Sequence, residues 1–388
     1  MKPILLIKGD SSVCYGILEK FGQRLFEAFT LLGEDVIYAD PSVEDIRGFA
    51  GREYKAVIAE EDLIYNNIDD STGRPLFDSF IGPKFNIWLD NPLTFYGQLE
   101  NIPGNYNVLT IDHQYVDLIN RYYKGVKAFF MPPGGTPPKK TVPFEQREYT
   151  LSFVGTYSDW RSDLEAERSI NDFTTQAALA FLERLLNNPN GSFEKTAIDT
   201  CRELSLDTSN EELFVQIMAA FRPMSLIAAA VYRERVIEKL LAGGITVDVF
   251  GDSWKVSPFA DNRYLRIHPQ VGSESVSDIY ANSKISLNIM RWHKDSITER
   301  ILDPMFAGSM VLSDTTPALN NAFISGEEIL LYSLDALDDL PSFIREYENR
   351  ADIAENGMNK ALSEHTWEKR AKYILELAER NMNDEPDS

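Results

Sequence analysis

Cysteine and histidine are scarce in this sequence of 388 residues. The two cysteines and four histidines are Cys14, Cys201, His113, His268, His293 and His365. Two distant cysteines form neither a disulfide framework nor a CxxC pair, and the histidines lack HExxH spacing. We therefore predict no metal site, because zinc enzymes use such spacings to gather their ligands.

Positive charge and long apolar runs are also limited. There are 38 Lys and Arg residues against 60 Asp and Glu, which gives a net charge of −22. An acidic surface repels phosphate backbones, so no nucleic-acid partner is expected. The N-terminal apolar run, residues 3–7, is too short for a signal peptide or a membrane span. The sequence therefore predicts a cytoplasmic protein without a transmembrane segment.

Strands alternate with helices along most of the chain. Aromatic residues make up 11% of the sequence, which excludes a disordered chain. The alternation predicts an α/β protein with doubly wound parallel sheets. It pauses at the Pro-rich stretch 136–148 and restarts at 150–156, "TLSFVGT". Two Rossmann-like domains facing a central cleft are the predicted architecture.

The domain boundaries follow from this pause. We expect an N-terminal Rossmann-like domain over residues 1–140 and a C-terminal one over 150–365. Residues 160–230 have few strand signals and predict a helical insertion in the second domain. A C-terminal helix, 366–380, is expected to cross back to the first domain.

Residues 282–314 contain the most informative pattern, a strand, a polar loop, a helix and another strand. Ser296 and Thr298 are suitable N-caps for that helix. A helix N-terminus beside a polar loop favours an anion such as phosphate. Asp295 and Asp303 lie eight residues apart across it, with Arg300 nearby. On spacing alone, a solvated helix face with chance charges explains these residues better.

Several passages resemble the glycosyltransferases of the GT-B type. They read "SFVGT", "VDVFGDSW", "YANSKISLNI", "ERILDPMFAGSMVLSDTTPALNNAFISGEEILLY" and "ALSEHTWEKRAKYIL". Together they cover the C-terminal half, from about 150 to 380. More narrowly, this half is similar to the bacterial "glycosyl transferases group 1" family that includes CgeB-like spore-maturation proteins. The N-terminal half resembles that family more loosely, through "LTIDHQYVD" and "FFMPPGG".

The resemblance implies roles for the helix near Thr298. In that fold group two glutamates, separated by seven residues, flank this helix, and the second binds the ribose of the nucleotide sugar. Asp295 and Asp303 stand at these two positions, one methylene shorter than glutamate. Arg300 matches an arginine of the narrower family and is expected to neutralise the diphosphate.

The resemblance also implies further donor-binding residues in the second domain. They are Gly155, Thr156, Arg235, Gly251, Asp252, Trp254, Lys284 and Asn288. Simpler explanations exist for several of them: a strand-to-helix turn at Gly155, a core tryptophan at Trp254, and a lysine whose stem merely covers apolar surface at Lys284.

Catalytic and acceptor-side residues are expected mainly at strand ends. An inverting transfer needs a general base, and the candidates are Asp90, His113, His293 and Asp295. Capping and turn formation are the competing explanation for the first two. The turn that holds Gly9, Ser11 and Ser12 resembles the acceptor-side loop of the fold.

The resemblance implies a glycosyltransferase that needs no metal or other cofactor. Its donor would be a UDP-, GDP- or TDP-sugar, and its acceptor a glycan or protein in bacterial cell-surface assembly. A non-catalytic nucleotide-sugar-binding or scaffold protein of the same fold is the alternative. An oxidoreductase is disfavoured, because no GxGxxG follows residues 3–7.

Overall fold

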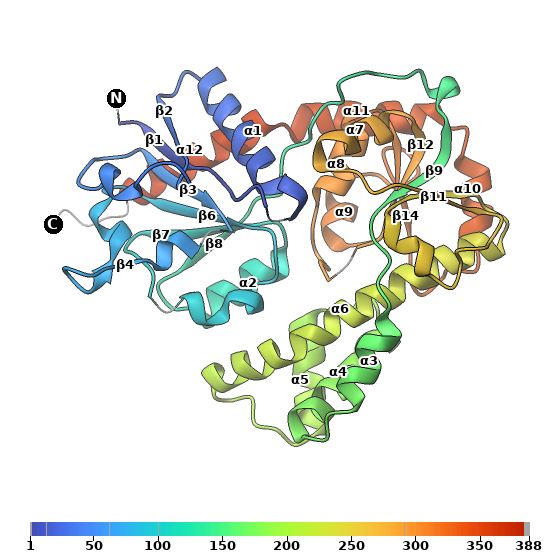
Figure 1. Ribbon diagram of the computed structural model, residues 1–388, viewed down its shortest axis with the longest axis horizontal. Helices are drawn as coiled ribbons and strands as arrows, with labels where there is room; N and C mark the ends of the chain where they lie inside the picture. The colour runs from blue at the N-terminus through green and yellow to red at the C-terminus, as the bar shows by residue number, and fades with distance from the viewer. Residues whose placement is uncertain (1, 13, 62, 100, 291, 384–388) are drawn as a thin grey trace. The chain divides into compact units, whose positions relative to one another are not determined.

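The computed structural model describes residues 2–12, 14–61, 63–99, 101–290 and 292–383, which form two compact units (Figure 1). Unit 1 contains the chain up to Gly134 together with the C-terminal segment from Glu364, and unit 2 contains Gly135–Ser363. Each unit has its own six-stranded parallel sheet with helices packed on it. The predicted α/β class with two Rossmann-like sheets is confirmed.

The sheet of unit 1 has the strand order β2-β1-β3-β6-β7-β8. Its strands are β1 (Ile4–Ile7), β2 (Val36–Ala39), β3 (Ala56–Glu60), β6 (Lys84–Trp88), β7 (Tyr106–Thr110) and β8 (Lys127–Phe130). Every residue of β1 and β3 is buried, because a central parallel strand is covered on both faces. This explains why β1 is an unbroken apolar run and why β3 is apolar up to its last residue, Glu60.

Two helices from opposite ends of the chain cover one face of this sheet. They are α1 (Ile17–Leu31) and α12 (Trp367–Asn383), and the ring centroids of Phe21 and Trp367 lie 4.9 Å apart. The other helix of unit 1 is α2 (His113–Tyr122), and β4 (Ile68–Asp69) pairs with β5 (Arg74–Pro75) in a small hairpin. Short 3-10 helices complete unit 1: Cys14–Gly16, Ile46–Phe49, Leu63–Asn66, Leu76–Ser79 and Pro92–Leu99.

The sheet of unit 2 has the strand order β11-β10-β9-β12-β13-β14. Its strands are β9 (Tyr149–Val154), β10 (Val247–Phe250), β11 (Leu265–His268), β12 (Ser283–Asn288), β13 (Met310–Asp314) and β14 (Leu330–Tyr332). The helices that follow these strands are α7 (Ser273–Ala281), α8 (Glu299–Phe306), α9 (Pro317–Ala322), α10 (Leu340–Tyr347) and α11 (Ala351–Glu364). Two 3-10 helices lie at Phe144–Gln146 and Asp252–Val256.

A helical layer is inserted between β9 and β10, as predicted. It consists of α3 (Trp160–Arg168), α4 (Phe173–Asn187), α5 (Phe193–Glu203) and α6 (Glu211–Ala242). Figure 1 shows α3, α4, α5 and the first half of α6 extending away from the sheet of unit 2. Phe181 of α4 stacks on Phe221 of α6 with ring centroids 5.0 Å apart. The second half of α6 instead packs on the sheet through Val236, Ile237 and Leu240.

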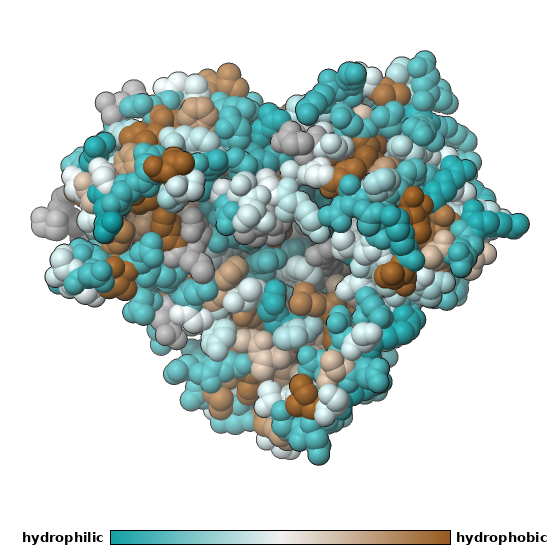
Figure 2. Space-filling view, in the orientation of Figure 1, coloured by the Kyte–Doolittle hydropathy of each residue, from teal (hydrophilic) through white to brown (hydrophobic). Residues whose placement is uncertain are grey.

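Helix α6 has 32 residues and, among the described helices, is the one long and apolar enough by composition to cross a membrane. More than half of its apolar stretch is buried in the structure, and Val236, Ile237 and Leu240 near its end pack on the sheet. We therefore assign it to the core of the unit. Figure 2 shows polar residues over most of the visible face, with apolar side chains in small groups.

Each sheet has one point where the strand order reverses. In unit 1 the chain passes from β1 to β2 on one side and then to β3 on the other, so the reversal lies between β1 and β3. In unit 2 it lies between β9 and β12. Open parallel sheets bind ligands at such points, beyond the carboxyl ends of the strands.

Candidate functional site

At the carboxyl edge of the unit 2 sheet, glycines from two loops approach each other closely. Gly155 follows β9 and Gly251 follows β10. A Cβ atom on Gly251 would lie 2.8 Å from the carbonyl oxygen of Gly155, so these loops approach too closely for a side chain. Gly155 and Thr156 thus lie at the edge where this fold binds ligands.

Trp254 does not serve as a stacking platform. It is fully buried, and its indole Nε1 donates a hydrogen bond of 2.8 Å to the carbonyl oxygen of Gly155. Its ring packs against Phe153 and Tyr157. The expectation that Trp254 binds the base is corrected: the ring is a core residue that supports the Gly155 loop. Asp252, in contrast, is exposed and pairs with Lys255.

Arg233 and Arg235 lie two residues apart on α6 and differ in burial. Arg235 was the predicted donor ligand, but its side chain is exposed. Arg233 is 5% exposed, donates a hydrogen bond to the carbonyl oxygen of Thr156, and lies over the Phe153 ring. The reason is helical periodicity, because Arg233 shares the buried face of α6 with Val236 and Ile237. Arg233 is therefore the arginine at the end of β9.

Helix α8 begins at Glu299, close to the predicted start. Thr298 is its N-cap residue, but the Thr298 side chain makes no capping hydrogen bond. Its buried Oγ1 has no hydrogen-bond partner in the described part of the chain. The N–H groups of the first turn are therefore not covered by this hydroxyl. Such a helix N-terminus favours an anion.

Asp303 lies one turn into α8 and is 3% exposed. Its Oδ1 accepts a hydrogen bond of 2.8 Å from the backbone N–H of Thr136. Thr136 is equally buried, and its Oγ1 makes no hydrogen bond with any described residue. The resemblance implies that Asp303 binds a ribose; in this structure its carboxylate is buried beside Thr136, in the segment that follows Gly135.

Arg300 is half-buried on α8 beside Asp303. Its Nε lies 3.6 Å from Oε1 of Glu299. Burial raises the pKa of the Tyr280 hydroxyl on α7. The charge of Arg300 lowers that pKa, and the charge of Asp303 raises it. A spacing of three residues makes the Arg300 and Asp303 side chains neighbours on the surface of α8.

A buried carboxyl supports the loop between β12 and α8. Asp314, the last residue of β13, accepts a 2.6 Å hydrogen bond from the backbone N–H of Met290. Burial raises the pKa of Asp314 from its usual 3.8 to about 6, while the charge of Lys294 opposes that rise. The Lys294 ammonium lies 4.8 Å from the centre of the Tyr232 ring. Asp314 was not among the predicted residues, although it ends a strand at the ligand edge.

The predicted catalytic residues His293 and Asp295 both belong to this loop. The His293 ring packs against Trp292 with centroids 5.5 Å apart. Both residues are partly exposed. Their positions precede α8, where the donor sugar and phosphate are expected, so both stay predictions.

Two predicted donor residues of β12 lie at opposite ends of that strand. Asn288 is its last residue and donates a 2.9 Å hydrogen bond to Oγ of Ser313. Lys284 is near its beginning, where the ammonium lies 5.7 Å from the centre of the Phe144 ring. Parallel strands present ligands at their carboxyl ends, so the structure does not bring Lys284 to the site. The simpler explanation, a lysine covering apolar surface, fits its contacts.

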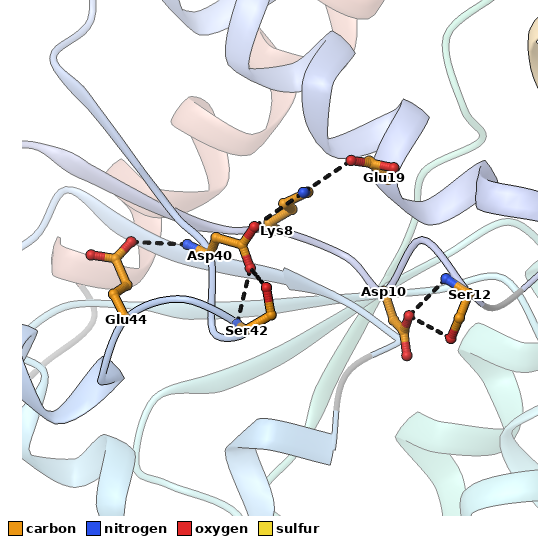
Figure 3. Close-up of polar contacts among 7 residues, drawn as sticks. All are labelled: Lys8, Asp10, Ser12, Glu19, Asp40, Ser42 and Glu44. Carbon is orange, nitrogen blue, oxygen red and sulfur yellow. Dashed lines mark hydrogen bonds and ion pairs between the residues drawn. The ribbon is translucent and has the colours of Figure 1, made fainter.

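In unit 1, the predicted acceptor-side turn follows β1. A Cβ atom on Gly9 would lie 2.8 Å from Cβ of Leu18, so glycine permits the close approach of α1. Ser12 donates two hydrogen bonds of 2.7 Å, from its backbone N–H and its hydroxyl, to Oδ1 of Asp10 (Figure 3). Ser11 is exposed in the same turn.

Lys8 precedes this turn but is engaged by two acids (Figure 3). Its Nζ lies 3.0 Å from Oε1 of Glu19 and 3.1 Å from Oδ2 of Asp40. The hydroxyl of Ser42 is the main cause that lowers the pKa of Asp40 to about 2. Lys8 therefore has its charge matched by these carboxylates and adds no positive field for a phosphate.

The other two predicted catalytic residues also lie at strand ends of unit 1. Asp90 follows β6, and its backbone N–H donates to Oε1 of Glu61 across 2.5 Å. His113 begins α2, where its ring stacks on Phe130 with centroids 3.7 Å apart. Asp112 caps that helix through a 2.8 Å bond from Gln114 N–H. Glu61 was missed by the sequence analysis, because its backbone conformation and amide contacts are not visible as a motif.

Groups of three or more His, Cys, Asp or Glu side chains that could hold a metal ion do not occur within the described ranges. Cys201 is buried as a free thiol in α5.

Residues 233–376 match the model of a family described as "Glycosyl transferase-like". This segment includes α8 and the strands on both sides of it. No curated protein matches the sequence.

Solved structures of glycosyltransferases are similar over almost the whole chain. Sucrose-phosphate synthase from Thermosynechococcus elongatus aligns with a TM-score of 0.55 at 12% identity, over 99% of this chain and 100% of that one. AviGT4, a glycosyltransferase involved in avilamycin A biosynthesis, aligns with a TM-score of 0.51 at 11% identity, over 99% of both chains. T4 phage BGT in complex with its UDP-glucose substrate gives 0.51 at 9% identity, over 99% of this chain and 100% of that one.

At such low identity these likenesses define the fold. The chain has the GT-B fold, with two Rossmann-like sheets of the kind found in glycosyltransferases. Within that fold, the segment that matches the glycosyl transferase-like family is the one that carries α8.

Proposed function

We propose that the protein is a glycosyltransferase that takes its sugar from a nucleotide-sugar donor bound to unit 2. The observation that carries this proposal is the arrangement on α8. Thr298 leaves the helix N-terminus without a side-chain cap, and Arg300 and Asp303 lie three residues apart on the same helix, as neighbours on its surface. A helix N-terminus with an arginine suits a diphosphate, and a carboxylate suits the two hydroxyls of a ribose.

The chemistry required of such a site is stabilisation of a leaving group. When the bond between the anomeric carbon and the phosphate oxygen breaks, the diphosphate gains negative charge. Donors fixed in advance, such as helix N–H groups and a guanidinium, stabilise that charge in the transition state. We propose that these groups suffice and that the reaction needs no metal ion.

We extend the proposal to the acceptor, the cellular role and the donor nucleotide. The acceptor, a glycan or a protein, binds to unit 1, and the activity serves bacterial cell-surface glycan assembly in the cytoplasm. The passages resembling CgeB-like proteins support this direction. A UDP-sugar is the first donor to test, because one structural neighbour is described in complex with UDP-glucose.

Two measurements on the full chain test the proposal. Thermal shift with UDP, GDP and TDP is compared with NAD and NADP; a ligand at 100 times its Kd stabilises by ~2.7 kcal/mol. Hydrolysis of UDP-, GDP-, TDP- and CMP-sugars is then followed by release of the nucleotide. We expect stabilisation by one nucleoside diphosphate and slow release from its sugar. Binding without turnover against any acceptor would point to a nucleotide-sugar-binding protein instead, and stabilisation by NAD alone would refute the proposal.

A further inference from the structure

Three successive residues in the middle of α6 lie at the carboxyl edge of the unit 2 sheet. They are Tyr232, Arg233 and Glu234, and all three side chains are buried. Here α6 passes from the helical insertion onto the sheet (Figure 1), and Arg233 donates to the carbonyl oxygen of Thr156, just beyond the end of β9. Successive side chains of a helix point in directions about 100° apart, so these three residues can contact different loops.

Glu234 holds the loop that follows β9 and the first turn of α3. Its carboxylate accepts hydrogen bonds of 2.8 and 2.6 Å from the two terminal nitrogens of Arg161. Trp160 Nε1 donates to the same carboxylate across 3.1 Å, and the hydroxyl of Tyr157 across 3.4 Å. A two-pronged bond between a guanidinium and a carboxylate fixes direction as well as distance. Glu234 therefore sets the course of the chain beyond Thr156.

Tyr232 contacts the loop that precedes α8. The ammonium of Lys294, in that loop, lies over the Tyr232 ring, 4.8 Å from its centre, where the ring attracts a cation. The Tyr232 hydroxyl donates to the carbonyl oxygen of Leu185, in the last turn of α4. The beginning of the same loop is held by the bond from Met290 N–H to Asp314. Helix α6 therefore supplies a contact to the middle of this loop.

The two loops leave neighbouring strands. β9 and β12 are paired at the reversal point of the sheet. The first loop carries Gly155 and Thr156; the second carries His293 and Asp295 and leads to the N-terminus of α8, which has no side-chain cap. Affinity for a ligand falls in proportion to the fraction of molecules whose loops are in the binding arrangement. A helix that holds both loops therefore raises the affinity for a ligand bound between them.

We propose that Tyr232 and Glu234 are positioning residues for the nucleotide-sugar donor, which hold the loops after β9 and β12 in the arrangement that binds the nucleoside diphosphate. The inference rests on the proposed glycosyltransferase function. The two side chains act through Lys294 and Arg161 and need not touch the donor. The helical insertion then has a task at the site, because α6 supplies both side chains and α4 bonds to one of them.

Glu234→Gln tests the first contact. Glutamine keeps one acceptor oxygen but loses the charge and the second acceptor for Arg161. The probe is whichever of UDP, GDP and TDP stabilises the wild-type protein most. We expect its calorimetric affinity to fall about tenfold, as it does when about one tenth of the molecules keep the binding arrangement. Glu238→Gln, exposed one turn further along α6, is the matched control and should keep wild-type affinity.

Two substitutions of Tyr232 test the second contact. Tyr232→Leu removes the ring beneath Lys294, so the affinity for the same nucleotide should fall about fivefold. Tyr232→Phe keeps the ring and loses only the bond to Leu185, so it should stay within about twofold of wild type. All affinities are measured at a temperature where circular dichroism shows each variant folded, so that lost stability does not enter them.

A merely structural role makes a different prediction. It would lower the melting temperatures of Glu234→Gln and Tyr232→Leu and leave the affinities of the folded variants within twofold of wild type, which would overturn the positioning role. An equal loss of affinity in Glu238→Gln would overturn it as well. A wild-type protein that binds no nucleoside diphosphate and no nucleotide sugar would instead refute the proposed function, and the positioning role with it.

Discussion

The backbone N–H of Thr136 donates a 2.8 Å hydrogen bond to Oδ1 of Asp303, which ties the first segment of unit 2 to α8. The residue predicted to bind ribose therefore also has a structural contact. The two roles make different demands on the side chain. An acceptor oxygen satisfies the Thr136 N–H, whereas two ribose hydroxyls are bound best by an ionised carboxylate.

Asp303→Asn separates these roles. Asparagine keeps one acceptor oxygen for Thr136 but loses the charge, so the melting temperature should change little. A hydrogen bond to a charged group contributes ~1.5–3 kcal/mol, so affinity for the preferred nucleoside diphosphate should fall about tenfold to a hundredfold. Calorimetry and thermal unfolding of one purified variant measure both quantities.

Two further variants are compared with Asp303→Asn: Asp303→Ala, which removes the acceptor oxygen, and Asp261→Asn, which is the control. The alanine variant leaves the buried Thr136 N–H without its acceptor and should lose stability as well as affinity. Asp261 is exposed in the same unit, and its substitution should alter neither. A purely structural Asp303 would be indicated by an Asn variant that loses stability and keeps its affinity.

Arg300→Ala tests the charge expected at the diphosphate. The Arg300 guanidinium is half-buried and only 3.6 Å from a single acid, Glu299, so its removal should cost little stability. Charge-assisted bonds to phosphate are strong, so we expect affinity for the nucleoside diphosphate to fall at least tenfold. Arg266→Ala, an exposed arginine of β11, is the control. Equal calorimetric affinities for Arg300→Ala and wild type would remove Arg300 from the site.

Arg233 and Arg235 form a matched pair for a stability test. Arg233→Met removes a buried donor to the Thr156 carbonyl and the cation above Phe153, so it should destabilise unit 2 by ~1.5–3 kcal/mol. Arg235→Met alters an exposed position and should stay within ~0.5 kcal/mol of wild type. Urea unfolding gives both values. The reverse order would show that the contacts of Arg233 with Thr156 and Phe153 do not stabilise unit 2.

The strands and helices that could be predicted are those whose packing leaves a pattern in the sequence. The buried parallel strand β1 is an apolar run, and it was predicted because both of its faces are covered. Strands β11 and β14, "LRIH" and "LLY", are short edge strands and give no comparable signal. The C-terminal helix expected at 366–380 is α12 (Trp367–Asn383), a separate helix from α11.

The features of the candidate site also divide into those that a sequence pattern predicts and those that it does not. The start of α8 followed from its caps and spacing, and the buried face of Arg233 was readable from its distance to Val236, Ile237 and Leu240. The burial of Trp254 and Asp303 was not, because it depends on loops and on a segment 167 residues away. The conformation of Glu61 depends on amides at the end of another strand, which no local pattern encodes.

Asp314 provides a test of stability against pH. Its pKa is raised from 3.8 to about 6, mainly by burial. The unfolded chain therefore releases this proton near pH 4, and the folded protein retains it to about pH 6. Between these values the folded state binds more protons, so Asp314 lowers stability as the pH rises. Two pKa units correspond to about 3 kcal/mol, and the full cost is present above pH 6.

Asp314→Asn should remove this cost. An amide oxygen can still accept the hydrogen bond from Met290 N–H, while the group no longer ionises. The variant should match wild type near pH 4 and be more stable at pH 7.5 by ~1–3 kcal/mol, the lower values reflecting the attraction that Lys294 loses. Urea unfolding of both proteins at the two pH values measures the difference, and subtraction cancels the titration of all other carboxyls. A stability difference that is the same at both pH values would mean that Asp314 is not held protonated by burial.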